Sequence, residues 1–181
     1  MIKNERKVVF LDRDGVINKE VGYLHHIKDF KFIDGVFSAC QYFQKIGYSI
    51  VIVTNQSGIA RGYYQEEDFH VLTQWMVKEF SNNNIDILDV FFCPHGPEST
   101  CNCRKPEPGM LLNAKEKYNI NMYNSWMIGD KEADIGAANS AGINNTILVK
   151  TGHNIDESHS QAKFILKSEC LIFITLCKFK I

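Results

Sequence analysis

The chain has 181 residues, of which 45% are hydrophobic and 23% charged. This composition excludes an intrinsically disordered chain, and the length predicts a single domain over residues 1–181. The 20 Lys and Arg residues nearly balance the 21 Asp and Glu residues, which leaves a net charge of −1 at pH 7. That balance offers no basic surface for nucleic acid or for an anionic membrane, so we expect neither as a partner.

The apolar segments near both ends of the chain are too short for a targeting or membrane-spanning role. The run at 8–11 is shorter than the core of a signal peptide, and the segment 171–177 is shorter than the ~20 residues that a spanning helix needs. We therefore expect a cytoplasmic protein that acts as a monomer. In that compartment its six cysteines would stay reduced and serve as metal ligands or core residues.

Short β-branched runs alternate with helical patterns along the chain. The runs at 8–11 and 50–53 are apolar throughout, as expected of strands buried on both faces. The alternation predicts βαβ units, and hence the α/β class with one doubly wound, mainly parallel, Rossmann-like sheet. The predicted strands are 8–11, 49–54, 88–92, 125–128, 146–149 and a short one at 164–166; the predicted helices are 35–46, 65–80, 109–118 and 133–141.

Two long stretches, 18–34 and 93–108, carry no regular pattern and follow the first and third predicted strands. Long ordered loops in compact domains are usually functional. Because no large inserted cap domain fits in 181 residues, we expect loops around 18–28 and 93–108 to control access to a site.

The first predicted strand runs directly into Asp12-Arg13-Asp14-Gly15. Two carboxylates at this spacing can present one group as a nucleophile or metal ligand and the other as an acid or base. A loop with two solvated aspartates is the alternative interpretation. A calcium EF-hand is disfavoured, because its loop needs glycine at the sixth position and a flanking helix.

Two further strands end in polar residues. Thr54 and Asn55 follow the second strand, and Asp130 follows the fourth. In open α/β sheets, ligands bind outside the carboxyl ends of the strands, so these groups are expected to share one site with the first motif. Lys105 adds a cation; together with a divalent metal it would offset the repulsion between Asp12 and a phosphoryl group.

The segment from Cys93 to Cys103 has the pattern C-x-H-x5-C-x-C, with His95 and Cys101 as its other members. Three thiolates and one imidazole within eleven residues suit a tetrahedral structural zinc site without an open position. Chance clustering is the alternative, and a redox-active pair is disfavoured because no CxxC is present.

The segments FLDRDGVIN, TNQSGIARG, RKPEPGML and MIGDKEAD, in this order, resemble the four motifs of haloacid-dehalogenase-type phosphatases. With the zinc loop before RKP and with IKDFKFIDG after the first motif, the chain from about residue 8 to residue 153 is similar to one branch, the bacterial heptose bisphosphate phosphatases. The related branch that shares the zinc loop is the histidinol-phosphate phosphatases. The similarity covers about four-fifths of the chain.

The resemblance implies an Mg²⁺-dependent phosphatase that works through an aspartyl-phosphate. Asp12 would be the nucleophile, and Asp14 would act first as general acid and then as general base. Thr54 and Lys105 would stabilise the phosphoryl group. The resemblance places Mg²⁺ on Asp12, Asp130 and the backbone carbonyl of Asp14, zinc on Cys93, His95, Cys101 and Cys103, and substrate contacts on Glu20, Val21, Gly22, Tyr23, Asn55, Gln56, Ser57, Arg104 and Lys131.

The implied reaction removes the 7-phosphate of D-glycero-D-manno-heptose 1,7-bisphosphate and leaves heptose 1-phosphate, a precursor of ADP-heptose and the lipopolysaccharide core. Histidinol-phosphate hydrolysis is the nearest alternative. Arg104 favours the bisphosphate, because a guanidinium suits a second phosphate. A non-catalytic zinc-loop binding module is disfavoured, since all four motifs are intact. The stretch between His95 and Cys101 is shorter than in much of the family, and the tail 171–181 is more apolar.

Overall fold

The strands of this computed structural model, which describes residues 5–151 and 157–166, form one parallel sheet. They are β1 (Val8–Leu11), β2 (Ser49–Asn55), β3 (Ile87–Cys93), β4 (Trp126–Gly129), β5 (Asn145–Val149) and β6 (Phe164–Leu166). In the described residues the sheet has six strands in the order β3-β2-β1-β4-β5-β6. The predicted doubly wound α/β class is therefore confirmed, including the short strand at its edge.

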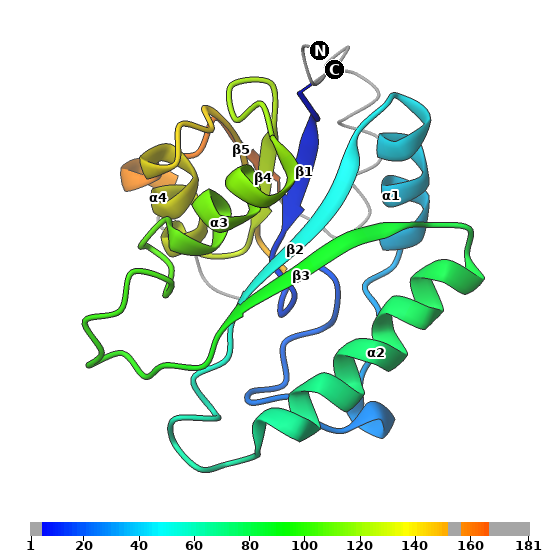
Figure 1. Cartoon of the computed structure of the whole chain (residues 1–181), viewed down its shortest axis with the longest axis vertical. Coiled ribbons are helices and arrows are strands. Elements are labelled where there is room, and N and C mark those ends of the chain that lie inside the picture. Colours follow the sequence, from blue (N-terminus) through cyan, green and yellow to red (C-terminus); the bar gives the residue numbers. More distant parts are fainter. Residues whose placement is uncertain (1–4, 152–156, 167–181) are drawn as a thin grey trace.

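Helices cover both faces of the sheet. The helices α1 (Val36–Lys45) and α2 (Glu66–Asn82) lie on one face, and α3 (Gly109–Tyr118) and α4 (Glu132–Ser140) lie on the other (Figure 1). Alternate residues of β1 point to opposite faces, because side chains in a strand repeat every two residues. Val9 and Leu11 accordingly pack in the core with α1 and α2, whereas Val8 and Phe10 pack with α3 and α4. Both cores require an apolar β1, which explains its unbroken run.

The element boundaries agree with the sequence prediction to within about two residues. One difference has a local cause. The helix α2 extends to Asn82, past Phe80, because Phe80 is fully buried and the chain turns only at Asn83 and Asn84.

The order of the strands changes direction at β1. The chain continues from β1 to β2 on one side and returns much later to pair β4 with the other side of β1. A crevice forms at such a switch point above the carboxyl ends of the strands. The predicted loops 18–34 and 93–108 both leave the sheet at this end, and the only regular element within them is the short turn Ile27–Asp29.

Among the described residues, no helix is long and apolar enough to cross a membrane. The tail 171–181, with Cys177, and Cys170 just before it lie outside the described residues.

Candidate active site

A buried ion cluster lies at the switch point, and Asp12 is its centre. The backbone N–H of Asp12 donates to the carbonyl of Ile128 on β4 at 3.0 Å, which continues the pairing of β1 and β4 one residue beyond the strand. The Nζ of Lys105 lies 2.9 Å from Oδ1 of Asp12 and 2.6 Å from Oδ1 of Asp134. It also donates to the carbonyl of Val53 at 2.8 Å. The ammonium group is thus fixed beside Asp12.

The charges in this cluster shift one another's protonation. Burial, together with the carboxylates of Asp134 and Asp130, raises the pKa of Asp12 to about 8, although the charge of Lys105 acts in the opposite direction. Burial alone would lower the pKa of Lys105, but the carboxylates of Asp12 and Asp134 raise it above its ordinary value. Lys105 therefore stays positively charged at neutral pH.

Asp12, Asp130 and Asp134 bring carboxylate oxygens within 4.8 Å of one another, and all three side chains are buried. Asp134 is not among the site residues predicted from the sequence. In the structure, Asp134 is the third residue of α4, and its Oδ2 accepts a hydrogen bond from the backbone N–H of Lys131 at 3.0 Å. The four-residue spacing between Asp130 and Asp134, across the start of a helix, is the signal that could have identified it.

The carboxylate of Asp14 is held by three side chains. Nη2 of Arg13 lies 2.9 Å from Oδ2 of Asp14, and Nε2 of Gln56 donates to the same oxygen at 3.1 Å. Nδ2 of Asn18 donates to the other oxygen at 3.0 Å. Burial acts to raise the pKa of Asp14, but Arg13, Asn18 and Gln56 outweigh it and hold that pKa below its ordinary value. The group is therefore a carboxylate at neutral pH in this arrangement.

The end of β2 contributes a hydroxyl and an amide with different uses. The hydroxyl of Thr54 is buried and accepts from Nε2 of Gln56 at 2.8 Å. Both polar groups of the Asn55 amide bond to the backbone of Lys105, since Nδ2 donates to its carbonyl and Oδ1 accepts from its N–H, each at 3.0 Å. Asn55 was predicted to contact substrate. It lines the pocket, but its amide is bonded to the backbone of Lys105 and fixes the position of that residue.

A pocket of about 470 Å³ opens above these groups. Its wall includes both predicted loops, which supply Tyr23 and Arg104. Val21 does not line it and is instead 53% exposed. The other predicted substrate residues do line it: Glu20, Gly22, Tyr23, Asn55, Gln56, Ser57, Arg104 and Lys131.

Several contacts join the loops around the mouth of this pocket. Oε2 of Glu20 lies 3.6 Å from Nζ of Lys131, so the first loop reaches the start of α4. The ring of Tyr23 meets that of Tyr63 edge to face, with 4.6 Å between ring centroids. Tyr64, which the sequence analysis did not single out, also lines the pocket and donates to Oε1 of Gln56 at 2.6 Å.

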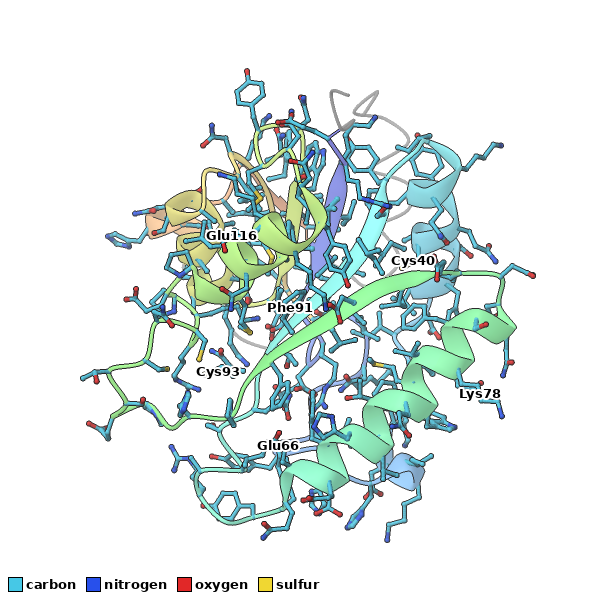
Figure 2. The ribbon with its side chains drawn as sticks, in the orientation of Figure 1. Cys40, Glu66, Lys78, Phe91, Cys93 and Glu116 are labelled. Atoms are coloured by element: carbon cyan, nitrogen blue, oxygen red, sulfur yellow. The ribbon has the colours of Figure 1, made fainter. Side chains whose placement is uncertain are left out.

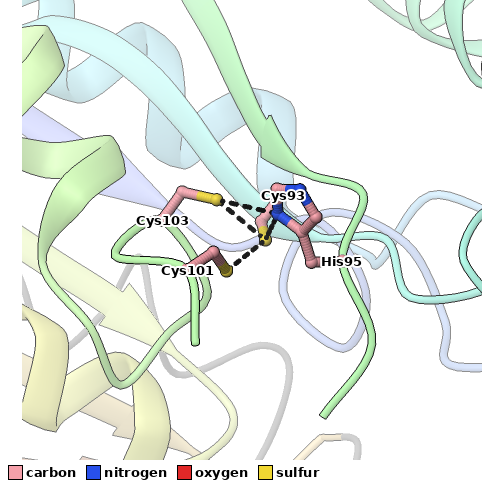
Figure 3. Close-up of side chains that lie close together, drawn as sticks. All are labelled: Cys93, His95, Cys101 and Cys103. Carbon is pink, nitrogen blue, oxygen red and sulfur yellow. Dashed lines mark hydrogen bonds between the residues drawn. The ribbon is translucent and has the colours of Figure 1, made fainter. Parts of the chain in front are cut away.

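The four predicted zinc ligands lie together at the end of β3. Figure 2 shows Cys93 at this end of the strand. The Sγ of Cys93 lies 3.5 Å from Nδ1 of His95, 3.7 Å from Sγ of Cys101 and 3.1 Å from Sγ of Cys103 (Figure 3). A tetrahedral zinc ion with Zn–S bonds of about 2.3 Å requires ligand separations of roughly 3.5–3.8 Å. The separations from Cys93 to His95 and to Cys101 fall in this range, whereas the one to Cys103 is shorter, so Cys103 would move slightly outward to hold the ion. Three thiols and one imidazole are a donor set that zinc prefers.

The zinc loop is also connected to the pocket. Nη1 of Arg104, the residue after Cys103, donates to the backbone carbonyl of His95 at 3.2 Å, and Arg104 lines the pocket wall. The loop that gathers the thiols thus fixes the course of the backbone that presents Arg104 and Lys105.

Comparison with known proteins gives a consistent set of relatives. A HAD-hydrolase-like family model matches residues 102–168. The D-glycero-beta-D-manno-heptose-1,7-bisphosphate 7-phosphatase of Vibrio cholerae is 50% identical over 159 residues, 84% of this chain and 86% of the relative. The D-glycero-alpha-D-manno-heptose-1,7-bisphosphate 7-phosphatase of Photorhabdus laumondii is 47% identical over 169 residues, 90% and 92% of the two chains.

Solved structures agree with these sequence matches. The D,D-heptose 1,7-bisphosphate phosphatase from B. bronchiseptica, crystallised with magnesium and phosphate, superposes with a TM-score of 0.82 at 26% sequence identity. The match covers 96% of this chain and 99% of the other.

Gly15 gives a test of how tightly the site is packed. Its φ of +84° is left-handed, and a Cβ there would overlap the carboxylate of Asp130. We expect Gly15→Ala to lower the free energy of unfolding by clearly more than the about 1–2 kcal/mol that left-handed backbone costs an ordinary residue. The matched control is Gly35→Ala, where φ is +87° and nothing lies within 4 Å of the new Cβ. Equal losses in urea denaturation would show that Asp130 is free to move aside.

Proposed function

The chain belongs to the heptose 1,7-bisphosphate phosphatases of the HAD-like hydrolases and is a phosphoric monoester hydrolase; from this premise we propose that it removes the 7-phosphate of D-glycero-D-manno-heptose 1,7-bisphosphate. The observation that carries the proposal is the pairing of buried Asp12 with buried Lys105 at the base of a pocket. Lys105 reduces the repulsion that an incoming phosphate meets from Asp12.

In the first step of the proposed reaction, an oxygen of Asp12 forms a bond to phosphorus and the bond from phosphorus to the sugar oxygen breaks. Asp14 gives a proton to that leaving oxygen. In the second step Asp14 takes a proton from water, the water oxygen attacks phosphorus, and the bond to Asp12 breaks. Thr54 and Lys105 contact the phosphoryl group throughout. Asp14 must therefore gain a proton before the first step, which the negative charge of a phosphate nearby favours.

The carboxylate cluster fits a divalent cation. Asp12, Asp130 and Asp134 offer hard oxygen ligands in a buried space where Lys105 alone does not balance their charge. We propose that Mg²⁺ is held by Asp12, Asp130 and the backbone carbonyl of Asp14. When bound, the ion would neutralise charge on the transferring phosphoryl group and favour the ionised form of Asp12.

The mouth of the pocket suits a substrate with a second anion. Arg104 and Lys131 line the wall together with Glu20 and Tyr23 of the first loop, and Glu20 lies beside Lys131. We propose that the cations hold the phosphate at the far end of the sugar and that Glu20, Gly22, Tyr23 and Ser57 contact its hydroxyls. Gln56 is left out of this set because its amide is already bonded to other side chains of the site. We propose that the enzyme is a single domain that works as a monomer in the cytoplasm. Its product, heptose 1-phosphate, would supply the synthesis of ADP-heptose and the lipopolysaccharide core.

Turnover tests the proposed activity directly. With Mg²⁺, we expect inorganic phosphate and heptose 1-phosphate from the bisphosphate, and little reaction with histidinol phosphate. Efficient hydrolysis of histidinol phosphate instead would overturn the proposed substrate. Removal of Mg²⁺ with a chelator should stop the reaction reversibly.

Asp12→Asn should abolish turnover of the bisphosphate, because an amide does not attack phosphorus. The control Asp86→Asn, at an exposed residue just before β3, should not alter turnover.

The zinc loop should act through stability rather than chemistry. Four protein ligands leave no open position on zinc, so loss of one weakens the loop that presents Arg104 and Lys105. We expect Cys101→Ser to lower the zinc content and the Tm, and activity to fall with them. Cys40→Ser, at a buried cysteine on α1, serves as control and should keep its zinc. Purified wild-type protein without zinc in elemental analysis would contradict this assignment.

Arg104 should distinguish bisphosphate from monophosphate substrates. A fixed guanidinium that bonds the second phosphate contributes about 1.5–3 kcal/mol. We expect Arg104→Ala to lower kcat/KM for the heptose bisphosphate by ~10–100-fold, with a much smaller change for a simple phosphate monoester. Arg6→Ala, at the opposite end of the sheet, should change neither value. Equal losses on the two substrates would remove Arg104 from substrate selection.

A further inference from the structure

Arg13 is a buried arginine that the proposed chemistry does not use. Its side chain is 1% exposed although it stands between the two aspartates of the first motif. Burial of a guanidinium is costly unless its N–H groups are paired with good geometry. The structure therefore contains a specific arrangement around Arg13 that needs a physical account.

The guanidinium of Arg13 joins three segments that are distant in sequence. Nε and Nη2 both donate to Oδ1 of Asp14, at 3.3 and 3.1 Å, and Nη2 is also 2.9 Å from Oδ2. The same Nη2 donates to the carbonyl of Leu24 at 3.1 Å and to Oε1 of Gln56 at 3.2 Å. The end of β1, the first loop and the segment after β2 are thus connected through one side chain.

The side-chain amide of Gln56 uses all of its hydrogen-bonding positions within the site. Its Oε1 accepts from Arg13 and from the hydroxyl of Tyr64, and its Nε2 donates to Asp14 and to Thr54. An amide with both donors and both acceptor positions occupied is held in one orientation. Arg13 and Gln56 therefore define one position for the Asp14 carboxylate from two sides.

We propose that Arg13 is a positioning residue that holds Asp14 where it protonates the leaving oxygen, and that it couples this position to the first loop through Leu24. The proposal rests on the phosphatase activity proposed above. The first loop carries Glu20, Gly22 and Tyr23 in the pocket wall, so the position of this wall and the placement of Asp14 share one link. A lysine keeps the charge but has a single nitrogen, so it cannot reproduce the contact that Nε and Nη2 make together with Asp14.

The leaving group separates a positioning role from a structural one. An alkyl phosphate releases an alkoxide, which needs the proton of Asp14 as its bond to phosphorus breaks. A nitrophenyl phosphate releases a stable phenolate, which needs none. Because kcat/KM covers only the steps up to release of the leaving group, later action of Asp14 on water does not enter the comparison.

The experiment measures kcat/KM of wild type, Arg13→Lys and Gln56→Met on the heptose bisphosphate and on nitrophenyl phosphate. We expect both variants to lose at least tenfold more activity on the alkyl substrate than on the aryl one, with Arg6→Lys as an unchanged control. Thermal unfolding establishes that each variant is folded.

Three outcomes would overturn the proposal: equal losses on the two substrates, no loss in folded variants, or failure of both variants to fold, which would make the network structural. The proposed substrate fails separately. If the wild type ignores the heptose bisphosphate but hydrolyses another alkyl phosphate, that ester replaces it in the comparison and Arg13 is still tested; if no alkyl phosphate is hydrolysed, both proposals fall.

Discussion

The contact between Lys105 and the carboxylates of Asp12 and Asp134 is the constraint on which the rest of the site depends. Breaking such a buried pair leaves an uncompensated charge, which is far more costly than the pair itself. The ammonium group of Lys105 is held beside these carboxylates by a further hydrogen bond from Nζ to the Val53 carbonyl on β2. The cluster therefore requires that β1, β2 and the start of α4 keep their spacing, and the parallel sheet provides that spacing.

Around this cluster, the two loops divide the remaining work. The first loop supplies one wall of the pocket and reaches α4 through Glu20 and Lys131. The second loop also lines the pocket, through Arg104 and Lys105, and is shaped by the three cysteines and His95. The described residues contain no domain inserted over the pocket. Two loops can enclose a small substrate in this way if the second loop is ordered by a rigid element, and the four ligand side chains of the zinc loop can provide one.

Much of this arrangement was predictable from the sequence. The apolar run of β1 and the patterns of the helices predict the sheet. The rule that strand ends share one edge predicts that Asp12, Thr54 and Asp130 lie together. Spacing predicts which strand end a residue follows, but not the direction of its side chain. The burial of Arg13 was missed for this reason, since its partner Gln56 is 43 positions away. Val21 illustrates the converse, because a residue inside a pocket-forming segment can still point outward.

The bond between Asn55 and Lys105 has a consequence for how this site can change over evolutionary time. It is made entirely to the backbone of residue 105, so it does not depend on which side chain stands at position 104. Position 105 is therefore anchored by Asn55, whereas the side chain at position 104 is free to vary. A lineage could exchange Arg104 for a residue that selects another phosphate ester while the lysine stays in register with Asp12. Selectivity could then drift through single substitutions without a passage through an inactive intermediate.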